Sequence, residues 1–325
     1  MAAVALYHHP ACGRHDTGWG HPEHQGRLRA IHEAIERVLP DLHGDVEPRE
    51  GRLADRAILE LVHVPAHLDR VERAAERARA ESRPVRLDLD TVVSGASWEA
   101  ARAVAGCAIE AVETVCAGDP RAAFCAIRPP GHHATPDRAM GFCLVNGVAV
   151  AARHALGSGL AGRVLIVDWD VHHGNGTQEI FYADPTVFYL SLHQSPFYPG
   201  TGAAAERGEG PGEGTTLNLP MPPALPPERY VDALLDGLDR ALDRFAPDLV
   251  LASAGFDAAR EDPLGGFTLE EEHFRTLTLE LVRRTASSAT GRVVSVLEGG
   301  YNPPELGRNA VAHLRALRDA ALELG

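Results

Sequence analysis

The chain has 325 residues, and its 45 acidic side chains outnumber the 31 basic ones, which gives a formal net charge of -14. This balance argues against nucleic-acid binding, because a protein that neutralises phosphates needs a basic face. Apolar residues make up 45% and charged residues 23%, so disorder and collagen-like repeats are excluded and a large core is expected.

The cysteines and the apolar segments indicate the compartment. The five cysteines are odd in number and show no paired metal spacing, so a disulfide scaffold is not expected. The N-terminus has no positively charged region, and no segment reaches the apolar length that a membrane span needs. We therefore expect a cytoplasmic protein that binds no membrane; nothing in the sequence indicates an oligomeric state.

Helical segments and short apolar runs follow one another along the chain. In chain order we predict helices over Glu23–Leu39, Pro65–Ala80 and Ser97–Ala117, strand Phe124–Ile127, helix Val145–Leu156, strands Arg163–Trp169 and Thr186–His193, helix Pro227–Phe245, strand Asp248–Gly255, helix Leu269–Ala286, strand Arg292–Gly300 and helix Pro304–Leu324. This alternation is typical of a parallel sheet with helices on both faces. The Gly- and Pro-rich stretch 200–227 is interpreted as a long loop near a site, because the alternation resumes after it. The sequence thus predicts one α/β domain over residues 1–325.

Each predicted strand ends in a polar cluster. In chain order the clusters are RPPGHHA, DWDVHH, SLH, AGFD and EGGY. Ligands bind outside the carboxyl ends of the strands in open parallel sheets. We therefore expect the five clusters to converge on one crevice.

Two of these clusters predict a metal site. Asp170 and His172 alternate along the end of one strand, and Asp257 follows another. Carboxylate and imidazole ligands suit a divalent ion such as zinc, and three protein ligands leave a position open for water. The alternative is that Asp170 and His172 cap a helix that begins near Gly174. The surrounding polar clusters favour the metal.

Two other clusters predict groups for hydrolysis. The tandem histidines His132 and His133 follow two prolines that stiffen the chain. Hydrolysis beside a metal needs a base for the water proton, and histidine is suited to this near neutral pH. Tyr301 follows two glycines and could donate a hydrogen bond to a developing oxyanion. The alternatives are a surface histidine pair and an ordinary aromatic residue.

Together the motifs resemble a known family. RPPGHHA, GFCLVNGVAVAA, DWDVHHGNGTQEIFY, SLHQSPFYPGTG, AGFDA and LEGGY resemble the zinc-dependent histone deacetylases and their bacterial relatives, which include acetoin utilisation proteins and acetylpolyamine amidohydrolases. GHPEHQGRL and DTVVSGASWEAA look like the early loops of the family, so the resemblance covers nearly the whole chain. It implies an arginase/deacetylase fold and hydrolysis of an N-acetyl amide.

The resemblance also implies which metal ions the protein binds and which residues hold them. Asp170, His172 and Asp257 match the zinc ligands of the family, with ferrous iron as an alternative metal. The residues that match the potassium site of the family are Asp168, Ser191 and Leu192, together with the backbone of Asp170 and His172.

Catalytic roles follow from the same matches. His133 is implied to be the general base, and His132 to act chiefly by electrostatics while Asp168 orients it. Tyr301 is implied to polarise the acetyl carbonyl together with the metal. Asn175 stands where one branch of the family has an Asp, and an Asn there is what the class II-like branch carries. A neutral amide orients His133 without raising its pKa as a carboxylate would.

The substrate contacts are implied in the same way. Phe142 and Tyr198 match the aromatic pair of the family's narrow tunnel, although Phe is more usual at the second position. Gly141 and Gly299 are assigned to the same surface, and Asp90 matches the acidic residue at the rim.

Leu264 bears on the choice of substrate. Polyamine-selective relatives carry an acidic residue in a D-P-E-G stretch, whereas this chain has DPLG with Leu264 at that position. An apolar residue favours acetyl-lysine in a peptide over a cationic acetylpolyamine. The net acidity of the chain favours any cationic substrate. We give the local residue more weight, and a small acyl amine remains the alternative.

Two other functions are compatible with the fold. An arginase-like ureohydrolase needs further acids close to the D-x-H motif for two manganese ions, and none follows His173 before Glu179. A non-catalytic protein that binds acetylated ligands is expected to have lost a ligand, a histidine or the tyrosine, and all six residues are present.

Overall fold

The computed structural model describes residues 2–42 and 44–324. Its centre is one eight-stranded sheet, in which every paired neighbour is parallel, with the order β2-β1-β5-β10-β9-β6-β7-β8. The strands are β1 (Val4–His8), β2 (Val46–Glu50), β5 (Ala122–Cys125), β6 (Val164–Asp168), β7 (Val187–Gln194), β8 (Thr216–Met221), β9 (Leu249–Ala254) and β10 (Val293–Leu297). A separate antiparallel pair is formed by β3 (Val85–Arg86) and β4 (Val92–Val93).

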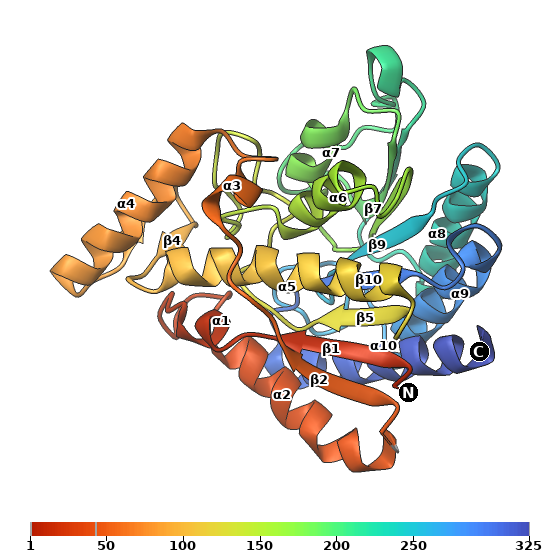
Figure 1. The fold of residues 1–325 in the computed structure, drawn as a ribbon, viewed down its shortest axis with the longest axis horizontal. Helices are drawn as coiled ribbons and strands as arrows, with labels where there is room; N and C mark the ends of the chain where they lie inside the picture. Colours follow the sequence, from red (N-terminus) through yellow and green to blue (C-terminus); the bar gives the residue numbers. More distant parts are fainter. Residues whose placement is uncertain (1, 43, 325) are drawn as a thin grey trace.

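Helices cover both faces of the sheet (Figure 1). One layer contains α5 (Ser97–Ala117) and α6 (Gly147–Gly157), and the other contains α2 (Gly26–Val38), α8 (Pro227–Leu242), α9 (Glu271–Ala289) and α10 (Pro303–Leu324). The remaining helices are α1 (Pro10–Arg14), α3 (Arg56–Leu59), α4 (Pro65–Glu81), α7 (Asn175–Phe181) and the 3-10 turns η1 (Leu39–Leu42) and η2 (Gly210–Gly212). No helix within the described ranges is long and apolar enough to span a membrane.

The composition of the central strands explains why they lie in the middle of the sheet. β5, β6, β9 and β10 are buried along their whole length, and each consists almost entirely of small or β-branched apolar residues. Strands of a parallel sheet that carries helices on both faces have this composition, because neither face reaches water. The predicted α/β class and the central parallel sheet are therefore confirmed.

Three strands of the central sheet were missed by the prediction, as were the short strands β3 and β4. β8 lies inside the stretch 200–227, so the interpretation of that whole stretch as a loop is wrong in part. Its residues pair with β7 at the edge of the sheet, and only Thr216 and Asn218 are buried, so the strand lacks a continuous apolar run. β2 forms the opposite edge, where only Val46 is buried. β1 is short and lies close to the N-terminus.

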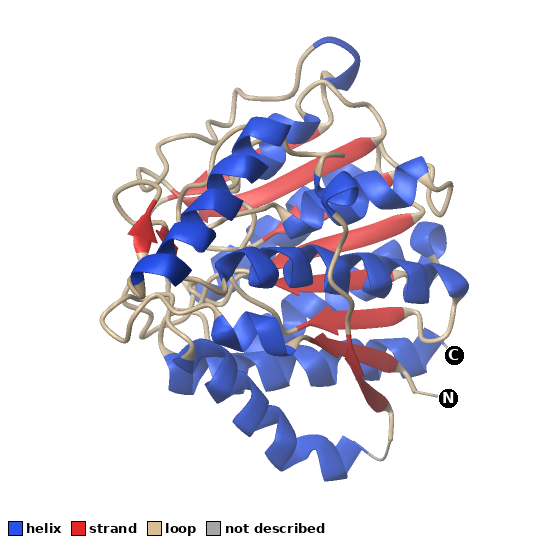
Figure 2. Cartoon of the chain, turned by 60° about the vertical axis from the view of Figure 1, so that its left-hand side comes forward, coloured by secondary structure: helices blue, strands red, loops and turns tan. Residues whose placement is uncertain are grey.

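Because the strands of the central sheet are parallel, the polar clusters that follow them lie at the same edge of the sheet. Figure 2 shows the strands pointing towards a side rich in loops, while both termini lie on the opposite side. Asp168 is the last residue of β6 and lies opposite Ser191 of β7 and Ser253 of β9. The ends of β5, β10, β9 and β6 are adjacent in the sheet order, so the segments that follow them meet at its centre.

Candidate active site

Three potential metal ligands meet beyond the ends of β6 and β9. Asp170, His172 and Asp257 each place one ligand atom so that all these atoms lie within 4.8 Å of one another. The His172 Nδ1 atom is 3.0 Å from Asp170 Oδ1 and 3.1 Å from Asp257 Oδ2. α7 begins after Gly174 without any side-chain cap. The alternative that Asp170 and His172 cap this helix is therefore wrong.

The surroundings of the two carboxylates fit a cation. The backbone N–H of Gly299 donates to Asp170 Oδ2 at 2.8 Å, and that of Val171 donates to Asp257 Oδ1 at 2.8 Å. Burial and the nearby charge of Asp170 raise the pKa of Asp257 to about 8. Two buried acids so close together are both ionised only beside a positive charge, and two carboxylates with one imidazole are a donor set that zinc accepts.

Position 299 requires glycine, because the carboxylates of Asp170 and Asp257 lie close to its Cα atom. A Cβ atom on Gly299 would lie 2.1 Å from Asp257 Oδ2 and 2.6 Å from Asp170 Oδ2. Neither carboxylate could remain in place beside a larger residue. Gly299 therefore contacts the ligands rather than a substrate surface alone.

His132 forms a buried ion pair beside the cluster. Its Nδ1 atom is 3.0 Å from Asp168 Oδ2, which also accepts a hydrogen bond from the Tyr189 hydroxyl at 3.0 Å. Burial acts to lower the pKa of His132, but the carboxylates of Asp168, Asp170 and Glu298 together raise it well above 6.5. His132 is thus held in its charged form.

His133 is in the opposite state. Burial, together with the neighbouring His132 and His172, lowers the pKa of His133 well below 6.5. Its Nδ1 atom lies 2.8 Å from Asn175 Oδ1, at the first residue of α7. The amide oxygen accepts a hydrogen bond from the Nδ1–H group, so the ring proton lies on Nδ1 and the Nε2 lone pair is free. This is the arrangement of a neutral general base.

Tyr301 lies just beyond β10 and is 8% exposed. Its backbone N–H donates to Asp262 Oδ2 at 2.5 Å, and the Arg27 guanidinium lies 4.8 Å from the centre of its ring. Burial raises the pKa of Tyr301 well above 10, although Arg27 acts to lower it. The hydroxyl is therefore neutral and can donate a hydrogen bond.

Two aromatic rings flank these groups. The ring of Phe142 is 5.6 Å from that of Tyr301, and the ring of Tyr198 is 5.1 Å from that of His133. Between them, Gly141 has a φ of +55°, and a Cβ atom there would lie 2.5 Å from His133 Cδ2 and 3.0 Å from the Tyr198 hydroxyl. The backbone at this position needs glycine for both its conformation and its contacts.

Comparison with known proteins decides the family. A model of the histone deacetylase domain matches residues 21–317. This chain belongs to the histone deacetylase family. It is 40% identical to a probable deacetylase of Methanothermobacter thermautotrophicus over 97% of this chain and 90% of that protein. It is 38% identical to histone deacetylase 10, chloroplastic, of rice over 94% of this chain and 71% of that protein.

A solved structure gives the same result. The crystal structure of the HDA15 HD domain superimposes with a TM-score of 0.90 and 36% identity, over 99% of this chain and 92% of that chain. The predicted arginase/deacetylase fold and the resemblance of the motifs are confirmed. Membership of this family supports a deacetylase, and histone deacetylases are generally zinc-dependent.

Other predicted residues of the histone deacetylase domain lie close to this centre. Half-buried Asp90 accepts a hydrogen bond from Thr91 Oγ1 at 3.1 Å, and Thr91 Oγ1 in turn accepts one from the backbone N–H of Phe142 at 3.2 Å. Leu264 donates its backbone N–H to Asp262 Oδ1 at 2.9 Å, on the carboxylate that also holds the backbone of Tyr301. Hydrogen bonds thus link Asp90, through Thr91, to the backbone of Phe142, and Leu264, through Asp262, to the backbone of Tyr301.

The residues that match a potassium site lie beneath the metal ligands. Ser191 pairs with Asp168 across β7 and β6, and Leu192 follows it in β7; all three are fully buried. The Ser191 hydroxyl is 3.0 Å from His193 Nδ1.

Sequence reasoning missed three residues of the candidate site. Phe197 stacks on His172 with the ring centres 5.3 Å apart and the planes 19° apart, which places it against a metal ligand. Arg27 donates to the carbonyl oxygens of Gly300 and Glu298 at 2.6 and 2.5 Å. Glu23 is wholly buried and binds Arg27 at 3.0 Å. The motif GHPEHQGRL, which contains Glu23 and Arg27, was the available signal.

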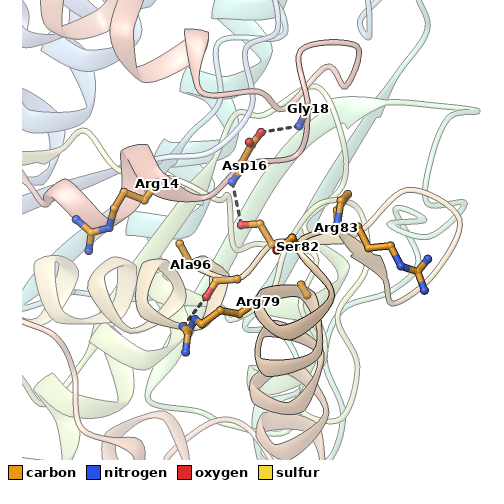
Figure 3. Close-up of a pocket in the computed structure, with 11 residues that line it drawn as sticks. Arg14, Asp16, Gly18, Arg79, Ser82, Arg83 and Ala96 are labelled. Atoms are coloured by element: carbon orange, nitrogen blue, oxygen red, sulfur yellow. Dashed lines mark hydrogen bonds between the residues drawn. The ribbon is translucent and has the colours of Figure 1, made fainter.

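A surface pocket of about 390 Å³ lies elsewhere in the molecule, between the C-terminal end of α4 and the segment before α5 (Figure 3). Two of its arginines already have partners: Arg14 binds Glu99 at 2.6 Å, and Arg79 binds the carbonyl oxygen of Gly95, which also lines the pocket, at 2.6 Å. Figure 3 shows the guanidinium group of Arg83 on the opposite side of the view from those of Arg14 and Arg79. None of the candidate catalytic residues lines this pocket.

Proposed function

We propose that residues 1–325 form a single catalytic domain of a zinc-dependent amidohydrolase that removes the acetyl group from acetyl-lysine in a peptide or protein. The observation that carries this proposal is the placement of two histidines, His132 paired with Asp168 and His133 paired with Asn175, beside a cluster of two carboxylates and an imidazole. Membership of the deacetylase family supports it.

The metal is proposed from the donor set. Zinc held by Asp170, His172 and Asp257 would lower the pKa of a water molecule and polarise a carbonyl oxygen. Ferrous iron accepts the same ligands and is the alternative ion. Potassium is proposed as a structural ion, held by the residues assigned to it above.

His133 is proposed to move the protons. Its free Nε2 atom takes a proton from the attacking water, and the resulting imidazolium later gives that proton to the leaving amine. Asn175 fixes the ring through the Nδ1–H without adding a negative charge. His132 remains charged in its pair with Asp168 and stabilises the negative charge that develops on the acetyl group.

The Tyr301 hydroxyl is proposed to donate a hydrogen bond to the oxyanion. Its backbone is fixed by Asp262, and its ring lies against Arg27 on one side and Phe142 on the other. A donor that is held before the reaction begins stabilises the transition state without reorganisation.

The substrate is proposed from the residues around the aromatic pair. Phe142 and Tyr198 suit the aliphatic chain of a lysine side chain, and Asp90 can accept a hydrogen bond from the peptide backbone. Leu264 puts an apolar group where a polyamine-selective enzyme needs a carboxylate. A small acyl amine is the second candidate, because the exposed Asp88 and the half-buried Asp90 would attract a cationic substrate.

The other two functions are less well supported. Within the described residues one group of metal-ligating side chains was found, and a dimanganese ureohydrolase needs more acids than this group provides. A protein that only binds acetylated ligands has no need for a neutral His133 and a charged His132 side by side.

Replacing Tyr301 with phenylalanine tests the chemistry. We expect kcat for acetate release from an acetyl-lysine peptide to fall by about 10²- to 10³-fold, because one oxyanion donor is lost while the ring remains. Zinc content and KM should change little. The control is Tyr7→Phe, which removes another buried hydroxyl that bonds to Thr114 Oγ1 at 2.7 Å far from the site. Equal activity of the Tyr301→Phe variant and the wild type would refute the assigned role.

A further inference from the structure

A buried carboxylate to which the proposed chemistry assigns no proton transfer and no substrate contact lies directly behind the catalytic histidines, and its charge also acts to raise the pKa of His132. Glu298 follows the last residue of β10 and is 1% exposed. Its Oε2 atom accepts hydrogen bonds from the backbone N–H groups of Gly131 at 2.6 Å and His132 at 3.1 Å. Its Oε1 atom is 3.0 Å from the hydroxyl of Ser253 in β9. One side chain thus joins the segments that follow β5 and β10 to strand β9.

The segment that carries the histidines depends on such an anchor. β5 ends at Cys125, so Gly131 and His132 lie beyond the strand pairing that would otherwise bind their N–H groups. A buried backbone N–H without an acceptor is unfavourable, because the hydrogen bond that it makes to water in the unfolded chain is not replaced. A Cβ atom on Gly131 would lie 2.9 Å from both Gly147 N and Val145 O, so the segment also has little room to shift towards α6.

The anchor works in either protonation state. Burial raises the pKa of Glu298 to about 7, although the charge of His132 acts to lower it. The ionised carboxylate accepts from both N–H groups and from the Ser253 hydroxyl. The neutral acid keeps Oε2 as the acceptor for the two N–H groups and donates its own proton to Ser253 Oγ. A glutamine has the same pattern of acceptor and donor.

We propose that Glu298 is a positioning residue that fixes the backbone of Gly131 and His132, and through it the imidazoles of His132 and His133, against the metal ligands. This role belongs to the proposed active site, and the expected change in kcat rests on the proposed function. Glu298 itself touches neither the aromatic pair nor the donor atoms of Asp170, His172 and Asp257. Its loss is therefore expected to change kcat rather than KM.

The test compares Glu298→Ala with Glu298→Gln in the zinc-loaded protein. For Glu298→Ala we expect kcat on an acetyl-lysine peptide to fall by about 100-fold, since a small misplacement of a catalytic group has this effect. KM should stay within about threefold of the wild type, and zinc content should be unchanged. Glu298→Gln should recover kcat to within about fivefold of the wild type, because its amide oxygen still accepts from both N–H groups.

Amide hydrogen exchange gives a readout that does not depend on activity. Exchange in the peptide that contains residues 128–134 should become faster in Glu298→Ala and remain as in the wild type in Glu298→Gln. The matched control is Ser295→Ala, on the same strand, which removes a buried hydroxyl that bonds to His313 Nε2 at 2.7 Å. This control should lower Tm without changing kcat or the exchange of residues 128–134.

Three outcomes would overturn the positioning role. These are unchanged exchange in Glu298→Ala, a Glu298→Gln variant as impaired as Glu298→Ala, and a Ser295→Ala variant that reproduces both effects. If Glu298→Ala does not fold, Glu298→Met provides a side chain of similar length without an oxygen acceptor. If the wild type releases no acetate, the proposed function fails, and the exchange comparison still decides whether Glu298 fixes the histidine segment.

Discussion

Replacing His133 with alanine is expected to lower kcat for acetyl-lysine hydrolysis by about 10³-fold, within the range that general acid–base catalysis supplies. Its burial beside His132 and His172 lowers its pKa, so the imidazole is neutral at pH 7 and ready to accept a proton. No other neutral imidazole takes its place when the side chain is removed, because His132 is held in its charged form. The measurement is steady-state acetate release with the zinc content of each variant determined in parallel.

A matched control separates chemistry from folding. His154 is a partly buried histidine on α6 that pairs with Glu113 at 3.0 Å, and His154→Ala should retain the wild-type kcat. A His133→Ala variant that binds zinc normally and keeps more than about a tenth of the wild-type kcat would contradict the base assignment.

Removal of the metal is expected to have an equally large effect. A chelator should lower activity by more than about 10³-fold, since the ion supplies several kcal/mol of transition-state stabilisation, and added zinc should restore it. Asp257→Ala should lose both the bound zinc and the activity, because it removes one of the two buried carboxylates. Zinc stoichiometry by elemental analysis and acetate release should fall together.

Here the control is an acid outside the site. Asp232 is exposed on α8, and Asp232→Ala should bind zinc and release acetate like the wild type. Full activity after chelation, or an Asp257→Ala variant that still binds one zinc ion with wild-type affinity, would show that the metal is held elsewhere.

Much of the fold could be predicted, because the buried central strands have a simple signature. β5, β6, β7, β9 and β10 are short runs of apolar residues, and parallel pairing under helices explains such runs. The edge strands could not be found in this way. β2 buries only its first residue, and β8 alternates between buried and half-buried positions within a Gly- and Pro-rich context. Their strand geometry comes from pairing with β1 and β7.

The location of the candidate site could be predicted more readily than the protonation states on which its chemistry depends. The rule that ligands bind at the carboxyl ends of parallel strands brought Asp170, His172 and Asp257 together correctly in space. The protonation states of His132 and His133 depend on burial and on neighbouring charges, which the order of residues does not reveal. The cytoplasmic location and the assigned catalytic roles stay predictions.

Glu298 shows why some functional residues escape sequence reasoning. LEGGY was recognised as a motif, but the role of its glutamate depends on which backbone groups lack a partner in the folded chain. Those groups belong to Gly131 and His132, more than a hundred and sixty residues earlier. Arg27 is similar, since its contacts with the Gly300 carbonyl and the ring of Tyr301 arise only from the packing of α2 against α10.

The most direct test is to measure kcat/KM of the zinc-loaded protein for acetate release from an acetyl-lysine peptide and from N-acetylated polyamines. We predict turnover of both kinds of amide with a clear preference for the peptide, because Leu264 offers no carboxylate to a distant ammonium group. Preference for the polyamines would contradict the proposed substrate, and the absence of acetate release from every acyl amine tested would contradict the proposed function itself.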